Sequence, residues 1–249
     1  MVTGKFNVVL FDLGSTLVYF DGDWDEIFNL GINALTLDLM DRGYSVPASS
    51  FTAAFRERMN EYYYQRETEF IEYTTGRILM DLLNEFGFAE ITPEQLRAPL
   101  ARMYSFTEEH WKLEEDARQM LDQLKAQDFR LGIVSNAADE ADVQTLVDQH
   151  GLRGYFEQIL ISASVGYRKP HPYIFQMALS HFNCHPSQAV MVGDTLGADI
   201  LGARNAGICS VWITRRAGTP DNRDHLDTIR PDAVINCLAD LPACLANWR

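Results

Sequence analysis

Two carboxylates and a hydroxyl group stand at the ends of short apolar runs in this sequence. Asp12 ends the first run, Ser135 ends a run in the middle of the chain, and Asp194 closes a third. Short runs rich in Val and Ile are typical of strands buried on both faces of a parallel sheet. The carboxyl ends of such strands open onto one edge of the sheet, where α/β proteins hold their ligands. We therefore expect these three groups to meet, although Asp12 taken alone is more typical of a turn that follows a buried strand.

The chemistry that suits such a cluster is attack on a phosphate. A carboxylate is a poor nucleophile toward a phosphate dianion unless their mutual repulsion is neutralised, and a hard divalent cation held by oxygen ligands does this. Asp12 and Asp194 can supply those oxygens. Lys169 is one of only four lysines in the chain and precedes a rigid Pro-His-Pro segment. We interpret it as a functional residue rather than a solvated one.

The second part of the sequence alternates apolar runs with helical patterns. Helices of about ten residues separate the runs, which predicts a parallel sheet with helices on both faces. Consecutive strands tend to be neighbours and their crossovers are right-handed, so the strands that end in the polar groups can share one edge. The expected strands are residues 8–11, 130–134, 159–161, 189–192, 210–213 and 233–235.

Between the first strand and residue 111 the apolar residues have a different spacing. Apolar residues recur at helical spacing in four segments, the last of which opens with the capping box Thr92-Pro93-Glu94-Gln95. Pro99 should kink or break this last helix. The pattern predicts a four-helix domain at 18–111, inserted into a core formed by 1–17 and 112–249.

Composition limits the partners. A net charge of −14 would repel a nucleic-acid backbone or an anionic membrane surface, so any anionic substrate needs a local positive site. The four cysteines lack metal-binding spacing, and we find no signal peptide or membrane span, so we expect a cytoplasmic protein. The sequence leaves monomer and homodimer open. We expect Arg215 and Arg216 to be solvated.

Four motifs together resemble those of the haloacid dehalogenase-like (HAD) hydrolase superfamily, in the subgroup whose helical cap follows the first strand. They occur in the family order and span nearly the whole chain: FDLGSTL at 11–17, IVSN at 133–136, GYRKP at 166–170 and VGDTLGADI at 192–200. The resemblance implies a Rossmann-like, doubly wound parallel sheet with a small four-helix cap. It also implies a small phosphorylated molecule as the substrate.

By this resemblance, Asp12 is the nucleophile that forms an aspartyl-phosphate, and Mg²⁺ is the cofactor. Lys169 offsets the carboxylate charge, and the Ser135 hydroxyl holds a phosphate oxygen. Asp199 could serve around the metal or be only an acid at a helix start. The implied metal ligands are Asp12, Gly14 through its carbonyl, Asp194 and Asp199. The implied substrate-binding residues are Leu13, Gly14, Ser135, Asn136 and Lys169.

Gly14 departs from the family pattern, because most phosphatases of this superfamily have a second Asp there as general acid and base. Such catalysis is typically worth ~10²–10⁴-fold. A good leaving group, an acid from the cap, a metal-bound water or weak activity would each accommodate the change. The alternatives are a 2-haloacid dehalogenase, in which Asp194 would be idle, and a weakly active or non-catalytic binding protein.

Overall fold

The computed structural model describes residues 6–248, which divide into two compact units. The described part of the α/β unit is 6–19, 112–136 and 147–248, and the helical unit is 20–111 together with 137–146. The segment at 137–146, directly after the IVSN motif, thus groups with the helices although it is distant from them in sequence.

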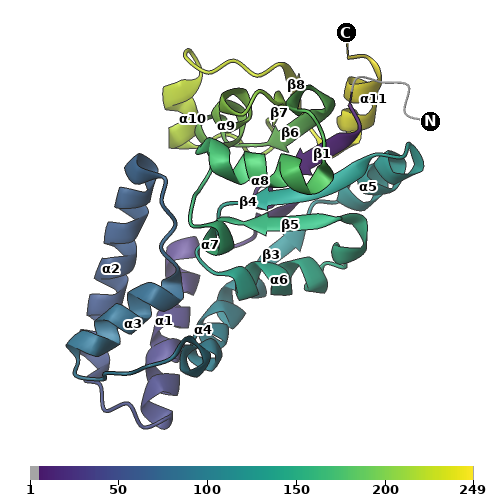
Figure 1. Cartoon of the computed structure of the whole chain (residues 1–249). Helices are drawn as coiled ribbons and strands as arrows, with labels where there is room; N and C mark the ends of the chain where they lie inside the picture. Colours follow the sequence, from purple (N-terminus) through teal and green to yellow (C-terminus); the bar gives the residue numbers. More distant parts are fainter. Residues whose placement is uncertain (1–5, 249) are drawn as a thin grey trace. The chain divides into compact units, whose positions relative to one another are not determined.

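The α/β unit is built on a six-stranded sheet with the order β5-β4-β1-β6-β7-β8 (Figure 1). Every pair of neighbouring strands is parallel, so the predicted parallel sheet is confirmed. The first strand lies between β4, which ends at Ser135, and β6, which ends just before Asp194, and its own residues are all buried. The strands are β1 (Val8–Phe11), β4 (Arg130–Ser135), β5 (Gln158–Ile161), β6 (Ala189–Gly193), β7 (Cys209–Ile213) and β8 (Ala233–Ile235).

Helices flank this sheet (Figure 1). On one face, Ile174, Phe175 and Phe182 of α8 pack with the apolar side chains of β1 and β6 in one buried cluster. Burying a large apolar side chain is worth roughly 1.5–3 kcal/mol, so this cluster fixes the strands whose ends carry the polar groups. The helices of this unit are α5 (Ala117–Ala126), α7 (Ser162–Val165), α8 (Pro172–Phe182), α9 (Leu201–Asn205), α10 (Pro220–His225) and α11 (Leu241–Ala246). Another helix, α6 (Glu140–Gln149), is divided between the units, because 140–146 groups with the helical unit.

The helical unit contains the four helices that the apolar spacing predicts: α1 (Trp24–Asp41), α2 (Ala48–Glu69), α3 (Thr75–Glu85) and α4 (Pro93–Glu108). Ile32 and Leu35 of α1 join Phe51 of α2 in its buried core. Gly31 lets α1 approach α4 closely, because a Cβ atom there would lie 2.6 Å from the Met103 carbonyl oxygen.

Pro99 does not break α4, so that part of the expectation is wrong. The helix continues from Pro93 to Glu108. Leu96, Leu100 and Met103 lie on its buried side, and their burial offsets the hydrogen bond that Pro99 cannot donate.

Two short strands, β2 (Val18–Phe20) and β3 (Trp111–Leu113), pair with each other where the chain passes between the units. The sequence analysis missed them, since three residues give too little alternation to identify a strand.

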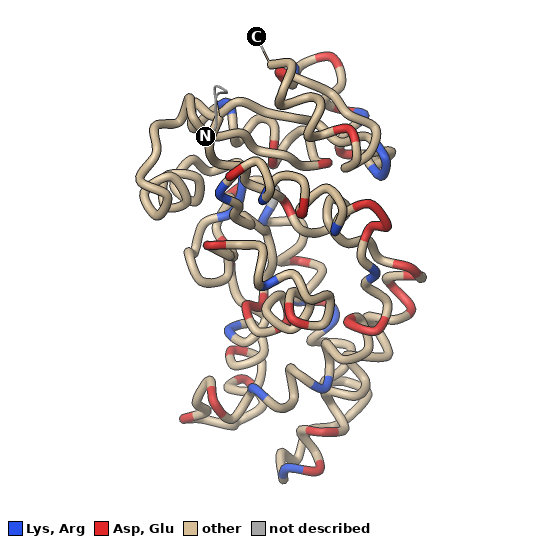
Figure 2. The backbone as a smooth tube through the Cα atoms, turned by 90° about the vertical axis from the view of Figure 1, so that its right-hand side faces the viewer, with Lys and Arg blue, Asp and Glu red and all other residues tan. Residues whose placement is uncertain are grey.

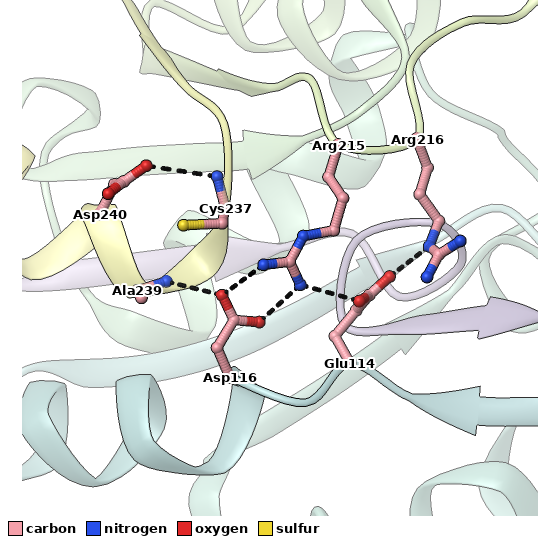
Figure 3. Close-up of polar contacts among 7 residues, drawn as sticks. All are labelled: Glu114, Asp116, Arg215, Arg216, Cys237, Ala239 and Asp240. Atoms are coloured by element: carbon pink, nitrogen blue, oxygen red, sulfur yellow. Dashed lines mark hydrogen bonds and ion pairs between the residues drawn. The ribbon is translucent and has the colours of Figure 1, made fainter.

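Arg215 and Arg216 follow β7 and bind two acids that follow β3 (Figure 3). Arg215 contacts both Asp116 oxygens at 2.8 Å and Glu114 at 2.8 Å, while Arg216 donates to the other Glu114 oxygen. The Arg216 guanidinium also lies 3.6 Å from the centre of the Tyr19 ring. The prediction that these arginines are solvated is therefore wrong for Arg215, which is partly buried between the two acids, whereas Arg216 is exposed and also forms an ion pair. We call Glu114, Asp116, Arg215 and Arg216 the arginine clamp.

Acidic residues are spread along much of the chain and are interspersed with basic ones (Figure 2). Among residues 6–248, no helix combines the length and the apolar character needed to cross a lipid bilayer.

Candidate active site

The sheet register brings the three predicted groups to one edge. Phe11 at the end of β1 pairs with Ile133 on one side and with Val192 on the other. The residue that follows, Asp12, donates its backbone N–H to the Val192 carbonyl at 2.9 Å. Ser135 ends β4, and Asp194 follows β6 directly, so both leave the sheet on either side of Asp12. The sequence therefore places these residues side by side through strand pairing alone.

Lys169 reaches this edge from the loop between α7 and α8. Its Nζ atom lies 2.6 Å from Oδ1 of Asp12 and 2.7 Å from Oδ1 of Asp199. The side chain of Asn136 holds the loop, accepting the Lys169 N–H at 2.8 Å and donating to the Lys169 carbonyl at 2.9 Å. Asn136, which the sequence analysis names only as a substrate-binding residue, therefore also has a role in positioning the lysine.

Asp199 belongs to a single π-helical turn, η3 (Leu196–Ile200), a feature that often marks functional sites. Its Oδ2 atom accepts the Thr195 N–H at 3.0 Å. Gly193 makes this packing possible, because a Cβ atom there would lie 2.2 Å from Oδ2 of Asp199. The glycine before Asp194 thus has a steric reason that the sequence alone did not reveal.

The charges of this group do not balance. Asp12, Asp194 and Asp199 are buried, and each has a carboxylate oxygen within 4.8 Å of the others. Lys169 contacts two of them, Asp12 and Asp199, so full ionisation of these four groups leaves two negative charges uncompensated. Three clustered carboxylates supply the oxygen donors that hard divalent cations prefer. The donor set and its charge therefore fit the Mg²⁺ ion that the motifs imply.

The same excess of charge perturbs the acids. Burial, together with the neighbouring Asp199, raises the pKa of Asp12 to about 6, although Lys169 opposes the shift. Burial and then the charges of Asp12 and Asp199 raise the pKa of Asp194 well above its ordinary value. Burial acts to lower the pKa of Lys169, but the attraction of Asp12 and Asp199 outweighs it and the pKa is raised. Lys169 is accordingly a permanent cation at neutral pH.

The remaining predicted residues lie on the loop after β1 or at the end of β4. Leu13 and Ser135 are buried, and Gly14 is half-buried and forms a single bridge with Val18. The Thr16 hydroxyl is buried and has no hydrogen-bond partner among residues 6–248. The sequence analysis also missed Trp212 and Asn222, both of which donate to the backbone carbonyl of Asp194. No spacing or motif in the sequence connects them to Asp194.

Comparison with known families agrees with this geometry. The family model described as haloacid dehalogenase-like hydrolase matches residues 48–213, which is more than half of the chain. The chain belongs to the haloacid dehalogenase-like hydrolase family. The resemblance inferred from the four motifs is therefore confirmed at the level of the family.

Relatives within the HAD family include named phosphatases. A glyceraldehyde 3-phosphate phosphatase of Methanothermobacter thermautotrophicus is 36% identical over 45% of this chain, and the match spans 49% of that protein, about half its length. The pyrimidine 5′-nucleotidase YjjG of Escherichia coli is 28% identical over 97% of this chain and 98% of its own.

Solved structures extend the likeness of fold to another chemistry. The 2-haloacid dehalogenase of Pseudomonas syringae pv. tomato superimposes with a TM-score of 0.66 at 23% identity, covering 98% of this chain and 100% of that one. At that identity the likeness concerns the fold alone, so the choice between the two chemistries depends on the site.

Proposed function

We propose that this HAD-family hydrolase is a Mg²⁺-dependent phosphohydrolase that acts on a small phosphorylated metabolite through a phosphorylated Asp12. The observation that carries the proposal is the cluster of three buried carboxylates with a single lysine, whose charge calls for a divalent cation. Relatives named as phosphatases support the same reaction class.

Each residue of the site has a proposed task. One oxygen of Asp12 attacks phosphorus, the bond to the leaving oxygen breaks, and the leaving group departs with the electron pair. Lys169 orients Asp12 and neutralises charge on the transferred phosphoryl group, while the Ser135 hydroxyl and the N–H groups of Leu13 and Asn136 hold its oxygens. Water then cleaves the aspartyl-phosphate, which regenerates the carboxylate and releases inorganic phosphate.

The proposed ligands of Mg²⁺ are Asp12, the carbonyl oxygen of Gly14, Asp194 and Asp199. When bound, the ion would cancel the repulsion between the carboxylates and the phosphate. Asp199 also anchors Lys169, with which it shares a hydrogen bond of 2.7 Å. We further propose that 18–111 is the cap domain of this hydrolase and that 1–17 with 112–249 is its core.

Gly14 shapes the expected substrate preference. It offers no side chain to protonate the leaving oxygen, so esters whose leaving group departs as a stable anion should react faster than simple alkyl phosphates. A dehalogenase is less favoured, since displacement of halide from carbon requires no metal and gives Asp194 no task. The alternative that is not an enzyme is a binding protein that keeps the metal site but does not turn over substrate.

The test uses p-nitrophenyl phosphate, whose leaving group needs no protonation. We expect hydrolysis that depends on Mg²⁺, stops with EDTA and falls by at least about 10³-fold in Asp12→Asn. A matched control is Asp128→Asn, at the exposed turn after α5, which should leave the rate unchanged. Halide release from 2-haloacids without metal would instead identify a dehalogenase. Folded protein that binds Mg²⁺ without any turnover would identify the binding protein.

A further inference from the structure

The backbone carbonyl of Asp194 is held by two side chains from distant parts of the sequence. The indole Nε1–H of Trp212 in β7 donates to it at 2.8 Å, and the amide Nδ2 of Asn222 in α10 donates to it at 2.8 Å. A carbonyl with both lone pairs engaged leaves its peptide unit little freedom to rotate. The direction in which the Asp194 side chain leaves the backbone is therefore set by these two donors.

Asn222 also holds the other side of the same loop. Its Oδ1 accepts the N–H of Leu196 at 2.7 Å, and its Nδ2 makes a second bond to the Ala217 carbonyl at 3.0 Å. The side chain is buried, and every amide atom named here has a partner. A carboxamide fits because it has a donor and an acceptor on one planar group. Asp at this position would face the Asp194 and Ala217 carbonyls with oxygen in place of N–H.

The local sequence explains how Asn222 arrives there. Thr219 caps α10, accepting the backbone N–H of Asn222 at 3.3 Å, and Pro220 occupies the first helical position. The start of the helix is thus fixed before the side chain of its third residue reaches the loop. The cap acts on the backbone of Asn222, whereas the amide acts on Asp194, so the two contributions can be separated by mutation.

We propose that Asn222, assisted by Trp212, is a positioning residue that fixes the loop at 194–196 and so sets the Mg²⁺ affinity of Asp194. The inference rests on the proposed function, since it assigns Asn222 a role toward the same metal site. Residues that orient a metal ligand typically change metal affinity by 10–100-fold when they are replaced.

The experiment measures Mg²⁺ binding to the full chain by isothermal titration calorimetry, alongside p-nitrophenyl phosphate kinetics as a function of Mg²⁺ concentration. We expect Asn222→Asp to raise the Mg²⁺ dissociation constant about 10–100-fold, with much of kcat recovered at saturating Mg²⁺. The matched control is Thr219→Ala, which weakens the start of α10 but leaves the amide in place. Its dissociation constant should stay at the wild-type value. Trp212→Phe should also raise the Mg²⁺ dissociation constant, but by less than Asn222→Asp does.

The possible outcomes decide between the two proposals. Unchanged Mg²⁺ affinity in Asn222→Asp, or an equal loss in Thr219→Ala, would overturn the positioning role while leaving the phosphohydrolase intact. Wild-type protein that neither binds Mg²⁺ nor hydrolyses the ester would overturn both. Should Asn222→Asp fail to fold, Trp212→Phe decides, because unchanged affinity in that variant contradicts the inference.

Discussion

The α/β unit contains two clusters in which basic and acidic side chains meet, and they differ in balance. In the arginine clamp two arginines face two acids, and both acids lie between cations or backbone donors (Figure 3). In the candidate active site one lysine faces three carboxylates. The clamp is complete as the chain folds, whereas the active site is left with a deficit of positive charge.

Asp116 of the clamp and Asp12 of the active site have pKa values shifted in opposite directions. Burial acts to raise the pKa of Asp116, but hydrogen bonds from Arg215 and the Ala239 N–H outweigh it, and the pKa is lowered. Burial raises the pKa of Asp12 to about 6, and Lys169 does not cancel that effect. A cluster that lowers the pKa of its acids stabilises the fold at neutral pH. A cluster that raises the pKa of an acid has too little positive charge to stabilise the ionised carboxylate. Such clusters are common at functional sites.

The largest effect in this comparison should follow from removing Lys169, the cation that pairs with Asp12 and Asp199. We expect Lys169→Met to lower kcat/KM for p-nitrophenyl phosphate by about 10²–10³-fold, since the carboxylates and the phosphate then repel one another without an opposing charge. Steady-state kinetics at saturating Mg²⁺ measures this. Lys125→Met, at an exposed position of α5, is the control and should keep wild-type activity. Equal losses in both variants would contradict the assignment.

A smaller effect, on stability alone, should follow from unbalancing the clamp. Glu114→Gln leaves two arginines facing one acid, and we expect the free energy of unfolding to fall by about 1–3 kcal/mol, less than for a fully buried pair because solvent screens the arginines. Urea denaturation measures the change, and kcat per folded molecule should be unaffected. A drop in kcat with unchanged stability would show that the clamp is part of the catalytic machinery.

The smallest effect is the pH dependence of stabilisation by Mg²⁺. A carboxyl whose pKa is higher in the folded than in the unfolded protein binds its proton more tightly when folded. Asp12 therefore contributes less stability to the metal-free protein as pH rises from about 4 to about 6. Mg²⁺ competes with that proton, so at ten times its dissociation constant it should add about 1.4 kcal/mol above pH 7 and progressively less below pH 6.

Thermal denaturation at pH 5 and pH 8, with and without Mg²⁺, tests this dependence, and the expected shift at pH 8 is about 3–6 °C. Asp12→Asn should abolish it. A shift of equal size at both pH values would contradict the titration of these acids.

The parts of the molecule that the sequence predicts are those that depend on local patterns. Apolar runs that end in a polar residue predicted the sheet edge, and helical spacing predicted α1 to α4. Asp12 and Asp194 come together because strand pairing is a repeating interaction whose register follows from buried runs. The choice of metal ligands and the domain boundaries drawn from the sequence stay predictions.

The parts that the sequence could not predict depend on single side chains that meet across long separations. Asn222 contacts Asp194 because of the path of the loop before α10, which no periodic pattern in the sequence predicts. The arginines of the clamp look like ordinary surface residues in the sequence. The side-chain bonds of Asn136 to the Lys169 backbone were not predicted, because the two residues lie in separate motifs far apart in the sequence. Such contacts are specified by three-dimensional geometry rather than by spacing along the chain.

The close packing of Gly193 against Asp199 limits how this site can change. A single added methyl group at the end of β6 would push aside the carboxylate that anchors Lys169, and with it the lysine that touches Asp12. Variation at position 193 thus cannot be absorbed locally, since its effect passes through two side chains to the proposed nucleophile. In a redesign of this hydrolase, Gly193 should therefore be kept unless Asp199 and the contacts of Lys169 are changed with it.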